Sequence, residues 1–489
     1  MNDRPRFAMM PEILLIGLLL SAASIPARAQ TVSAPSSTAP AVNWTGLYVG
    51  GGVGYVANSF EYHFYANDMN SQSSSPYGGR GGLLSLMAGY DLMLTPSLVA
   101  GIAIDAEVSG LRSRQDNTVD GDGYFRRNGA WSVGGRVGWL ASPATLVYVP
   151  IGYTQAQYSW TDKYVLNNLK PTPRSGWTDG VYVGAGLETR VGGNWTLRGE
   201  YRYSWLDPVC VSKSAALPTC RGADVASSGL VREEQFVEQS MRVALAYRFN
   251  GPGYGIPANA GATRGRDAAV NPRNWSGFYI GAGGGAAALN EYTRAYNPIT
   301  GAIRYGFDVG SSGALGTIGG GYDYQFSPRL VAGVIADVDW SQVKSEQVQL
   351  DGTASGSGAF RRDHGWSVGA RAGWLATPDT LLYVPMGFTQ SHYTWDGAYF
   401  SYSNKDTKTF SADKNGFFAG FGVETMLTDH WTVRGEYRYA WFDGDVCAGS
   451  NAHQTIQACK GANDSVIDVT KVEDVREQTA RAVLSYKFN

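Results

Sequence analysis

The alternation of apolar and charged side chains in Trp195–Trp205 most constrains the fold of this chain. Odd positions of this segment carry aromatic rings, a leucine and a glycine, whereas even positions include Arg198, Glu200 and Arg202. Because a β-strand sends successive side chains to opposite faces, the segment has one apolar face and one charged face. In a helix the same charges would scatter around the axis, so a period of two residues predicts a strand.

Segments with this alternation recur along the chain, for example Leu98–Val108 and Met241–Phe249. They reach about ten residues, whereas strands of soluble proteins average about five to six and membrane-crossing strands need about 9–11. Rings at both ends of an apolar face, such as Trp131 and Trp139, match the two aromatic girdles of a membrane barrel. We therefore predict an all-β, transmembrane antiparallel up-and-down β-barrel, rather than the soluble β-sandwich that alternation alone also permits. The expected aromatic girdle consists of Trp44, Trp131, Trp139, Trp195, Trp205, Trp275, Trp366, Trp374, Trp431 and Trp441.

The chain contains two copies of one unit. Asn43-Trp-Thr-Gly-Leu-Tyr returns as Asn274-Trp-Ser-Gly-Phe-Tyr, and the block that begins at Trp195 returns at Trp431. Each copy ends in the pattern Tyr-x-Phe-Asn. We expect β-barrel units at residues 43–250 and 274–489, joined by a flexible linker at 251–273 that is rich in Gly, Pro and Ala.

The first unit contains about eight expected strands, an even number that suffices to close a small barrel. They lie at 44–56, 82–93, 97–110, 128–141, 145–160, 179–192, 194–207 and 238–249. Short joins alternate with long polar ones, which is typical of outer-membrane barrels with short periplasmic turns. The sequence thus predicts two tandem eight-stranded barrels. The alternative is one sixteen-stranded barrel, which would enclose an aqueous channel.

The N-terminal residues predict export. Arg4 and Arg6 precede an apolar run, and Ala27-Arg28-Ala29 fits a signal-peptidase site. We expect a cleaved signal peptide at 1–29, a flexible leader at 30–42 and a mature protein in the outer membrane. The 40 Lys and Arg against 42 Asp and Glu give no electrostatic case for nucleic-acid binding.

Three motifs resemble a known family. They are the Asn43-Trp-Thr-Gly-Leu-Tyr motif, the block Leu197-Arg-Gly-Glu-Tyr-Arg-Tyr and the terminal Tyr-x-Phe. The chain resembles the outer-membrane β-barrel family that includes the 25- and 31-kilodalton outer-membrane immunogenic proteins of Gram-negative bacteria. The resemblance implies eight-stranded barrels, and some members are associated with haemin binding or surface interactions. This chain departs from the family in carrying two copies, and in placing Asn after Phe249 and Phe488, the residues expected to signal barrel assembly.

Charged residues on the inward faces of the expected strands form a candidate site. An eight-stranded barrel is barely wide enough for its own side chains, and charges buried there must be paired. We interpret them as a salt-bridge plug; the alternative is a narrow ion path or a gated pore. The predicted lumen set consists of Asp105, Glu107, Arg136, Glu188, Arg198, Glu200, Arg202, Arg242, Asp337, Asp339, Arg371, Glu424, Arg434, Glu436, Arg438 and Arg481. In the first unit, Asp91 and Arg248 also occupy inward-facing positions of the expected strands.

The cysteines form one pair in each unit, Cys210 with Cys220 and Cys447 with Cys459. In an exported protein this spacing favours a local disulfide in each expected loop. Zinc would need two more ligands, of which His453 is present in one loop. No histidine recurs at the same place in both units, so we expect neither an enzyme nor a metal or cofactor.

Two functions remain open at this stage. The first is a structural or surface-interaction protein of the envelope, and the second is a passive porin-like channel for small solutes. Expected partners are outer-membrane lipid, the outer-membrane assembly machinery through the C-terminal strand, and haemin or host surface ligands. The haemin hypothesis is motivated by the resemblance and by loop rings such as Tyr62, Tyr65 and Tyr402.

Overall fold

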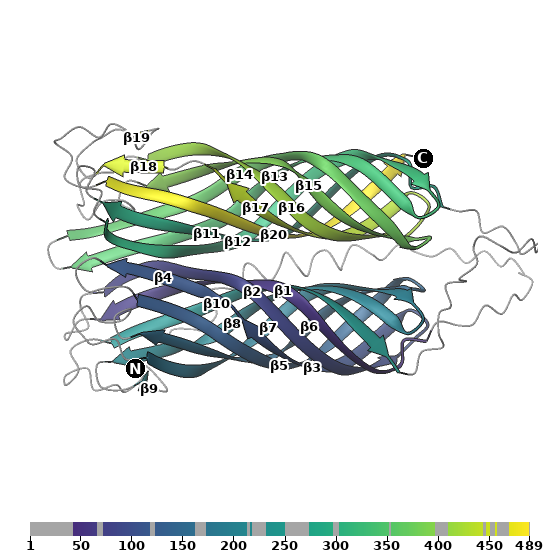
Figure 1. The fold of residues 1–489 in the computed structure, drawn as a ribbon, viewed down its shortest axis with the longest axis horizontal. Coiled ribbons are helices and arrows are strands. Elements are labelled where there is room, and N and C mark those ends of the chain that lie inside the picture. Colours follow the sequence, from purple (N-terminus) through teal and green to yellow (C-terminus); the bar gives the residue numbers. More distant parts are fainter. Residues whose placement is uncertain are drawn as a thin grey trace, which may run out of the picture.

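The computed structural model describes residues 43–65, 72–117, 123–161, 173–212, 216–217, 231–249, 273–296, 303–351, 354–396, 409–443, 446–449, 455–456 and 469–488. The expected signal peptide, the leader and nearly all of the expected linker lie outside these residues. In the described part, no helix has the length and hydrophobicity needed to span a membrane. The strands form two rings that stand side by side with their axes aligned (Figure 1).

The first ring closes on itself. It consists of β1 (Gly46–Tyr65), β2 (Gln72–Met93), β3 (Leu98–Ser109) with its continuation β4 (Arg112–Asn117), β5 (Gly123–Ser142), β6 (Thr145–Thr161), β7 (Pro173–Gly192), β8 (Trp195–Ser212) and β10 (Val231–Arg248). The two-residue strand β9 (Ala216–Leu217) pairs with β8. β10 pairs antiparallel with β8 on one side and with β1 on the other, where Tyr48 lies opposite Arg248.

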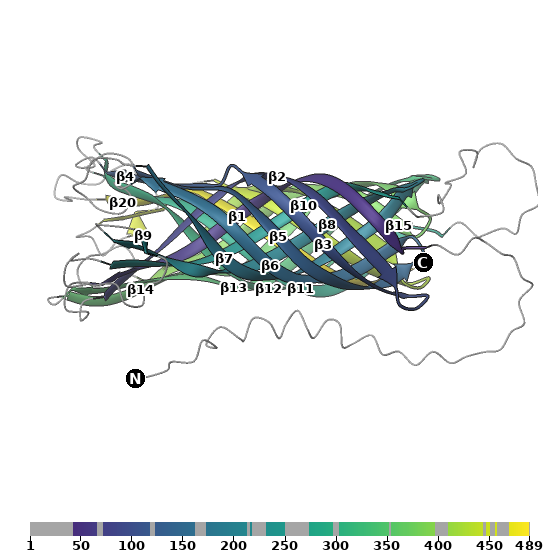
Figure 2. The same cartoon turned by 90° about the horizontal axis from the view of Figure 1, so that it is seen from below.

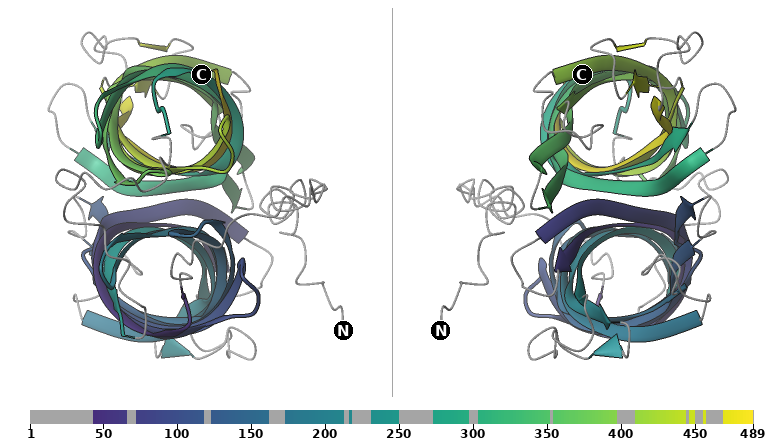
Figure 3. Two further views of the ribbon diagram at one scale, coloured as in Figure 1. Left: turned by 90° about the vertical axis from the view of Figure 1, so that its right-hand side faces the viewer. Right: turned by 90° about the vertical axis from the view of Figure 1, so that its left-hand side faces the viewer.

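The second ring also closes within its own unit. It consists of β11 (Gly277–Tyr296), β12 (Ile303–Ser327), β13 (Leu330–Asp351), β14 (Ala354–Thr377), β15 (Thr380–Asp396), β16 (Thr409–Met426), β17 (Trp431–Phe442) and β20 (Val469–Phe488), with β18 (Val446–Gly449) and β19 (Thr455–Ile456) beside β20. β20 pairs with β17 and β11, so Phe488 lies opposite Phe278. The prediction of two tandem barrels is confirmed and the sixteen-stranded alternative is wrong, as the end-on views show (Figure 3).

Several strands are longer than the alternation predicts. β2 begins at Gln72, although the alternating pattern begins at residue 82. The strands tilt across the barrel wall, and the additional residues lie at the end opposite the short turns (Figure 2). In outer-membrane barrels the short turns face the periplasm, so these residues extend the barrels outward. No lipid covers them there, and the sequence accordingly loses its alternation.

The barrel wall is apolar outside and polar inside, the reverse of a soluble protein. Leu84 and Leu86 of β2 are 58 % and 71 % exposed on the outer face, whereas Ser85 between them is buried. The same exchange occurs in β3, where Ile104 is exposed and Asp105 is buried. A surface of this kind is stable only against lipid.

The two barrels touch along their length. Gly310 on β12 meets Gly78 on β2 so closely that a Cβ atom on Gly310 would lie 2.8 Å from the Cα of Gly78. Nearby, the hydroxyl oxygens of Ser59 and Ser312 are 3.4 Å apart. At the outer end, β4 pairs with β12 and β2 pairs with β13, so the two rings become one continuous sheet.

We predict that replacing Gly310 with Leu separates the barrels without unfolding them. The new side chain would need the space that Asn58 and Gly78 occupy. A protease site is placed in residues 251–272, the chain is cleaved in mild detergent, and the fragments are separated by size-exclusion chromatography. Parental fragments should elute together and the Gly310→Leu fragments apart.

Gly316→Leu is the matched control. Gly316 lies on the same strand, and a Cβ there meets no atom within 4 Å, so its fragments should stay together. Co-elution of the Gly310→Leu fragments would show that this glycine contact does not hold the barrels.

Candidate functional site

The periplasmic part of the first lumen contains a closed square of charges. Arg136 on β5 donates hydrogen bonds to Asp91 at 2.5 Å and to Glu188 at 2.7 Å. Arg248 on β10 donates to the same two carboxylates at 2.5 and 3.0 Å. The four side chains come from four strands whose inward positions meet at one level. Two positive and two negative charges therefore neutralise each other through direct contacts.

The next layer links six more side chains across the barrel. Arg202 donates to Asp105 at 2.7 Å and to Glu200 at 2.6 Å. Arg242 on β10, the strand next to β8, also donates to Asp105 at 2.8 Å. Glu200 also accepts a hydrogen bond from Arg198, and from the hydroxyl of Tyr148 at 2.7 Å.

The outermost charged layer is built around Arg127. This guanidinium pairs with Glu107 and, at 2.9 Å, with Glu238. Glu107 also pairs with Arg242 at 2.8 Å, which joins this layer to the one below. Tyr158 donates its hydroxyl proton to Glu238.

Arg127 and Glu238 were absent from the predicted lumen set. In β5, Trp131 and Trp139 face outward, so strict alternation would also place residue 127 outside. A β-bulge between Arg127 and Gly129 shifts the phase by one residue and turns Arg127 inward. Glu238 shares the inward phase of Arg242, and extending that phase outward along β10 would have found it.

The second barrel repeats the network. Arg371 pairs with Asp323 at 2.5 Å and with Glu424 at 2.7 Å, and Lys487 replaces Arg248 in contacting Asp323 at 2.7 Å. Further ion pairs in this lumen join Arg438 with Asp337 and Glu436, Arg481 with Asp337 and Asp339, and Arg362 with Asp339 and Glu477. Arg434 lies over the ring of Tyr279. The bulge recurs too, between Arg362 and His364.

The structure places every residue of the predicted lumen set in the barrel interiors, each 7 % exposed or less. These are Asp105, Glu107, Arg136, Glu188, Arg198, Glu200, Arg202, Arg242, Asp337, Asp339, Arg371, Glu424, Arg434, Glu436, Arg438 and Arg481. Strict alternation on the inner positions brings them together. Their partners Asp91, Arg127, Glu238, Arg248, Asp323, Arg362, Glu477 and Lys487 complete the network.

Aromatic rings fill the first lumen beyond the charges. Phe60, Phe125, Tyr158 and Phe236 are buried together, with the Phe125 ring centroid 4.8 Å from Tyr158 and 5.0 Å from Phe60. The second barrel has a similar buried cluster that includes Phe360, Tyr393, Trp395 and Phe442. Each lumen therefore carries an apolar layer on the outer side of its ion pairs.

Trp44 and Trp275 do not belong to the lipid-facing girdle, and that part of the prediction is wrong. Both are fully buried at the periplasmic ends of the barrels. The Trp44 indole N–H donates to the carbonyl of Pro143 at 3.2 Å, and its ring lies 4.8 Å from the Arg248 guanidinium. Their burial has a local cause. Each Trp lies two residues before its strand, and the first residue of that strand is a glycine. Gly46 and Gly277 have φ of 143° and 140°, values that L side chains rarely adopt, and the chain turns there so that the Trp enters the mouth.

The other predicted girdle residues lie on the outer wall. Trp139, Trp195, Trp366, Trp431 and Trp441 are exposed, and Trp131, Trp205 and Trp374 are half-buried. Phe249 and Phe488, the expected assembly signals, are 50 % and 58 % exposed beside them.

Several other predicted residues fall where the structure gives no side-chain description. Cys220 and Cys459 lie outside the described residues, and the side chains of Cys210 and Cys447 are not described, so both disulfides stay predictions. For the haemin hypothesis, Tyr402 lies outside the described residues. Tyr62 and Tyr65 belong to β1 rather than to a loop, so that part of the prediction is wrong, and their side chains are not described. Among the described side chains, no group of three or more His, Cys, Asp or Glu is arranged to hold a metal ion.

Comparison with known families decides the classification. The outer membrane protein beta-barrel domain matches the chain twice, at residues 16–249 and 260–488. The chain belongs to this family. It is therefore an outer-membrane protein of the Gram-negative envelope, with its apolar outer wall in contact with lipid.

Similar members of the family are single-unit proteins. The 31 kDa outer-membrane immunogenic protein of Brucella melitensis biotype 1 is 28 % identical over 234 residues, which cover 45 % of this chain and 90 % of that protein. The 22 kDa outer membrane protein of Rhizobium leguminosarum bv. viciae is 29 % identical over 191 residues. This alignment covers 38 % of this chain and 74 % of that protein.

Solved structures resemble the chain weakly. A Pseudomonas aeruginosa FadL homologue aligns over 91 % of both chains with 9 % identity and a TM-score of 0.28. The Ail protein of Yersinia pestis aligns over 41 % of this chain and 99 % of its own, with 14 % identity and a TM-score of 0.22. Scores this low carry no argument about function.

We predict that Arg136→Met lowers the free energy of unfolding by about 3–5 kcal/mol, because it leaves Asp91 and Glu188 with one cation instead of two. Equilibrium unfolding in urea, with the protein in lipid vesicles, measures the loss. Arg329→Met is the control, since Arg329 is exposed at a short turn and should change stability little. Equal stability of the two variants would mean that the lumen charges do not support the fold.

Proposed function

We propose that this protein is a structural and surface-interaction component of the outer membrane. Its paired barrels anchor the chain in the envelope and hold their outer strand extensions above the lipid. The single observation that carries the proposal is the filling of both lumens by ion pairs and rings. The carboxylates of the three charged layers in the first lumen all pair with arginines of the protein itself; they are Asp91, Asp105, Glu107, Glu188, Glu200 and Glu238.

The shape of the outer ends supports the surface role. In β2 the last strongly exposed leucine is Leu84, yet the strand continues to Gln72. At about 3.3 Å per residue this extension reaches well past the hydrocarbon layer. The 31 kDa relative is immunogenic by its name, which is the property expected of a protein with material exposed at the cell surface.

A porin-like channel requires a continuous column of water through the barrel. We expect the purified protein in planar lipid bilayers to give no discrete current steps at neutral pH, because three layers of paired charges and one of rings cross each lumen. Single-channel recording measures this directly. Steps of porin size would refute the closed-barrel proposal and favour passive transport of small solutes.

Haemin binding is a finer hypothesis within the surface role. It rests on the family resemblance and on Tyr62, Tyr65 and Tyr402, whose side chains the structure does not describe. Binding should shift the Soret band of haemin when purified protein is added in stoichiometric amounts. An unchanged Soret band would remove haemin from the list of ligands.

A further inference from the structure

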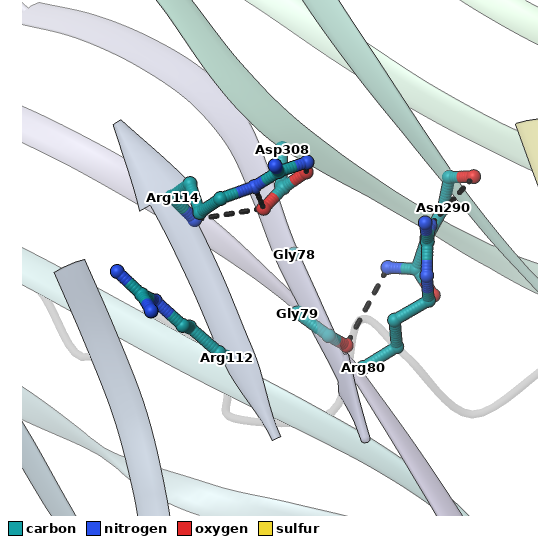
Figure 4. Close-up of a pocket in the computed structure, with 7 residues that line it drawn as sticks. All are labelled: Gly78, Gly79, Arg80, Arg112, Arg114, Asn290 and Asp308. Carbon is teal, nitrogen blue, oxygen red and sulfur yellow. Dashed lines mark hydrogen bonds and ion pairs between the residues drawn. The ribbon is translucent and has the colours of Figure 1, made fainter. Parts of the chain in front are cut away.

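A polar pocket of about 190 Å³ lies between the two barrels at their outer end (Figure 4). The first barrel supplies Gly78, Gly79 and Arg80 from β2 and Arg112 and Arg114 from β4, and the second supplies Asn290 from β11 and Asp308 from β12. Both units are therefore required to form it. Its volume corresponds to about six water molecules, which is enough for a phosphate group.

Arginines face each other across the strands at this pocket. Arg80 is the register partner of Arg112, and Arg112 is the register partner of Arg126 on β5. Like charges directly opposite each other on neighbouring strands are destabilising. A row of three guanidinium groups therefore needs a source of negative charge.

The carboxylates of the protein satisfy this row only in part. Asp474 pairs with Arg80 at 2.5 Å but also with Arg476 at 2.5 Å. Asp308 accepts the backbone N–H of Arg114 at 2.7 Å and interacts with its guanidinium.

Arg112 is left with an aromatic contact. Its guanidinium lies 5.6 Å from the ring of Tyr124, which Arg126 also approaches at 4.5 Å. Within the part of the chain that the structure describes, no carboxylate pairs with Arg112 or Arg126. No dashed line reaches Arg112 in Figure 4. Among the side chains that the structure describes around the pocket, positive charge thus exceeds negative charge.

The barrel fold itself does not require this row. In the second barrel the equivalent register positions hold Ser312, Lys344 and Arg361. Lys344 pairs there with Glu346 at 3.0 Å, and Glu346 occupies the position of Arg114. The arginine surplus belongs to the first barrel, on the side where the two units meet.

The height of the row indicates what it faces. Arg80 lies four residues outward from the lipid-facing Leu84 on β2. With about 3.3 Å per residue and a strand tilt of about 45°, Arg80 stands roughly 10 Å farther outward along the barrel axis than Leu84. The pocket is therefore level with the headgroups of the outer leaflet.

We propose that the pocket binds a phosphate group, carried by the phosphorylated headgroup of an outer-leaflet glycolipid or present as free phosphate. Guanidinium groups match phosphate oxygens with paired, charge-assisted hydrogen bonds. Arg112 and Arg80 are the donors, and Asp308 holds Arg114 at the rim through its backbone N–H. The bound anion offsets the repulsion along the arginine row, at the junction of the two barrels.

The test measures binding of phosphorylated lipid A to the full-length protein in detergent by native mass spectrometry. Dephosphorylated lipid A and inorganic phosphate are the comparison ligands. Affinity for phosphorylated lipid A should fall about tenfold or more in Arg112→Gln, and further in the double variant with Arg80→Gln. Arg112 is exposed, so the barrel should fold, which heat-dependent gel migration verifies.

Lys344→Gln is the matched control, since Lys344 takes the place of Arg112 in the second barrel and should leave the affinity unchanged. If the protein binds inorganic phosphate and Arg112→Gln loses that binding, the site is supported and free phosphate is its ligand. If the protein binds phosphorylated lipid A but neither inorganic phosphate nor dephosphorylated lipid A, the site is supported and the lipid headgroup is its ligand. Equal affinity for lipid A with and without phosphate, or equal losses in Lys344→Gln and Arg112→Gln, overturns the proposal.

Discussion

The mutual neutralisation of charges inside each barrel is the constraint on which the rest of the structure depends. A lipid-facing wall must be apolar, so the polar half of every alternating strand is forced into a lumen too narrow to hydrate it. The charges can remain there only as pairs with satisfied hydrogen bonds. Asp91, Arg136, Glu188 and Arg248 show the solution, a square in which each charge has two opposite neighbours. The same arrangement places paired side chains across the lumen.

Duplication adds a surface that a single barrel lacks. Close contact between the units depends on glycines, because two backbones meet at Gly78 and Gly310. Beyond the lipid, unpaired strand edges of the extensions complete each other across the two rings. The arginine row lies at this junction. A tandem arrangement thus creates a composite outer face, although each lumen repeats the other almost side chain by side chain.

Much of the fold and of the lumen site could be predicted because alternation is a local property. The side chains of Glu200 and Arg202 point into the lumen because of their positions in the alternating pattern of β8, independently of their neighbours in space. Prediction failed where one residue changed the phase or the path. The bulge next to Arg127 reversed the parity of β5, and the turn at Gly46 sent Trp44 into the barrel mouth. Neither event leaves a clear mark in hydrophobic periodicity.

By itself, the sequence determined that the chain is a duplicated membrane barrel with charges inside. Apolar and polar residues alternate along each strand, and this alternation sets the face to which each side chain points. The sequence favoured two barrels but left a sixteen-stranded alternative open. The tertiary structure decided that each unit closes on itself, since closure depends on which strand edges meet. It also decided which charges pair and where Arg80, Arg112 and Asp308 gather. Closure of one barrel brings Asp91 to Arg248, whereas Arg114 and Asp308, 194 positions apart, meet only because one barrel packs against the other.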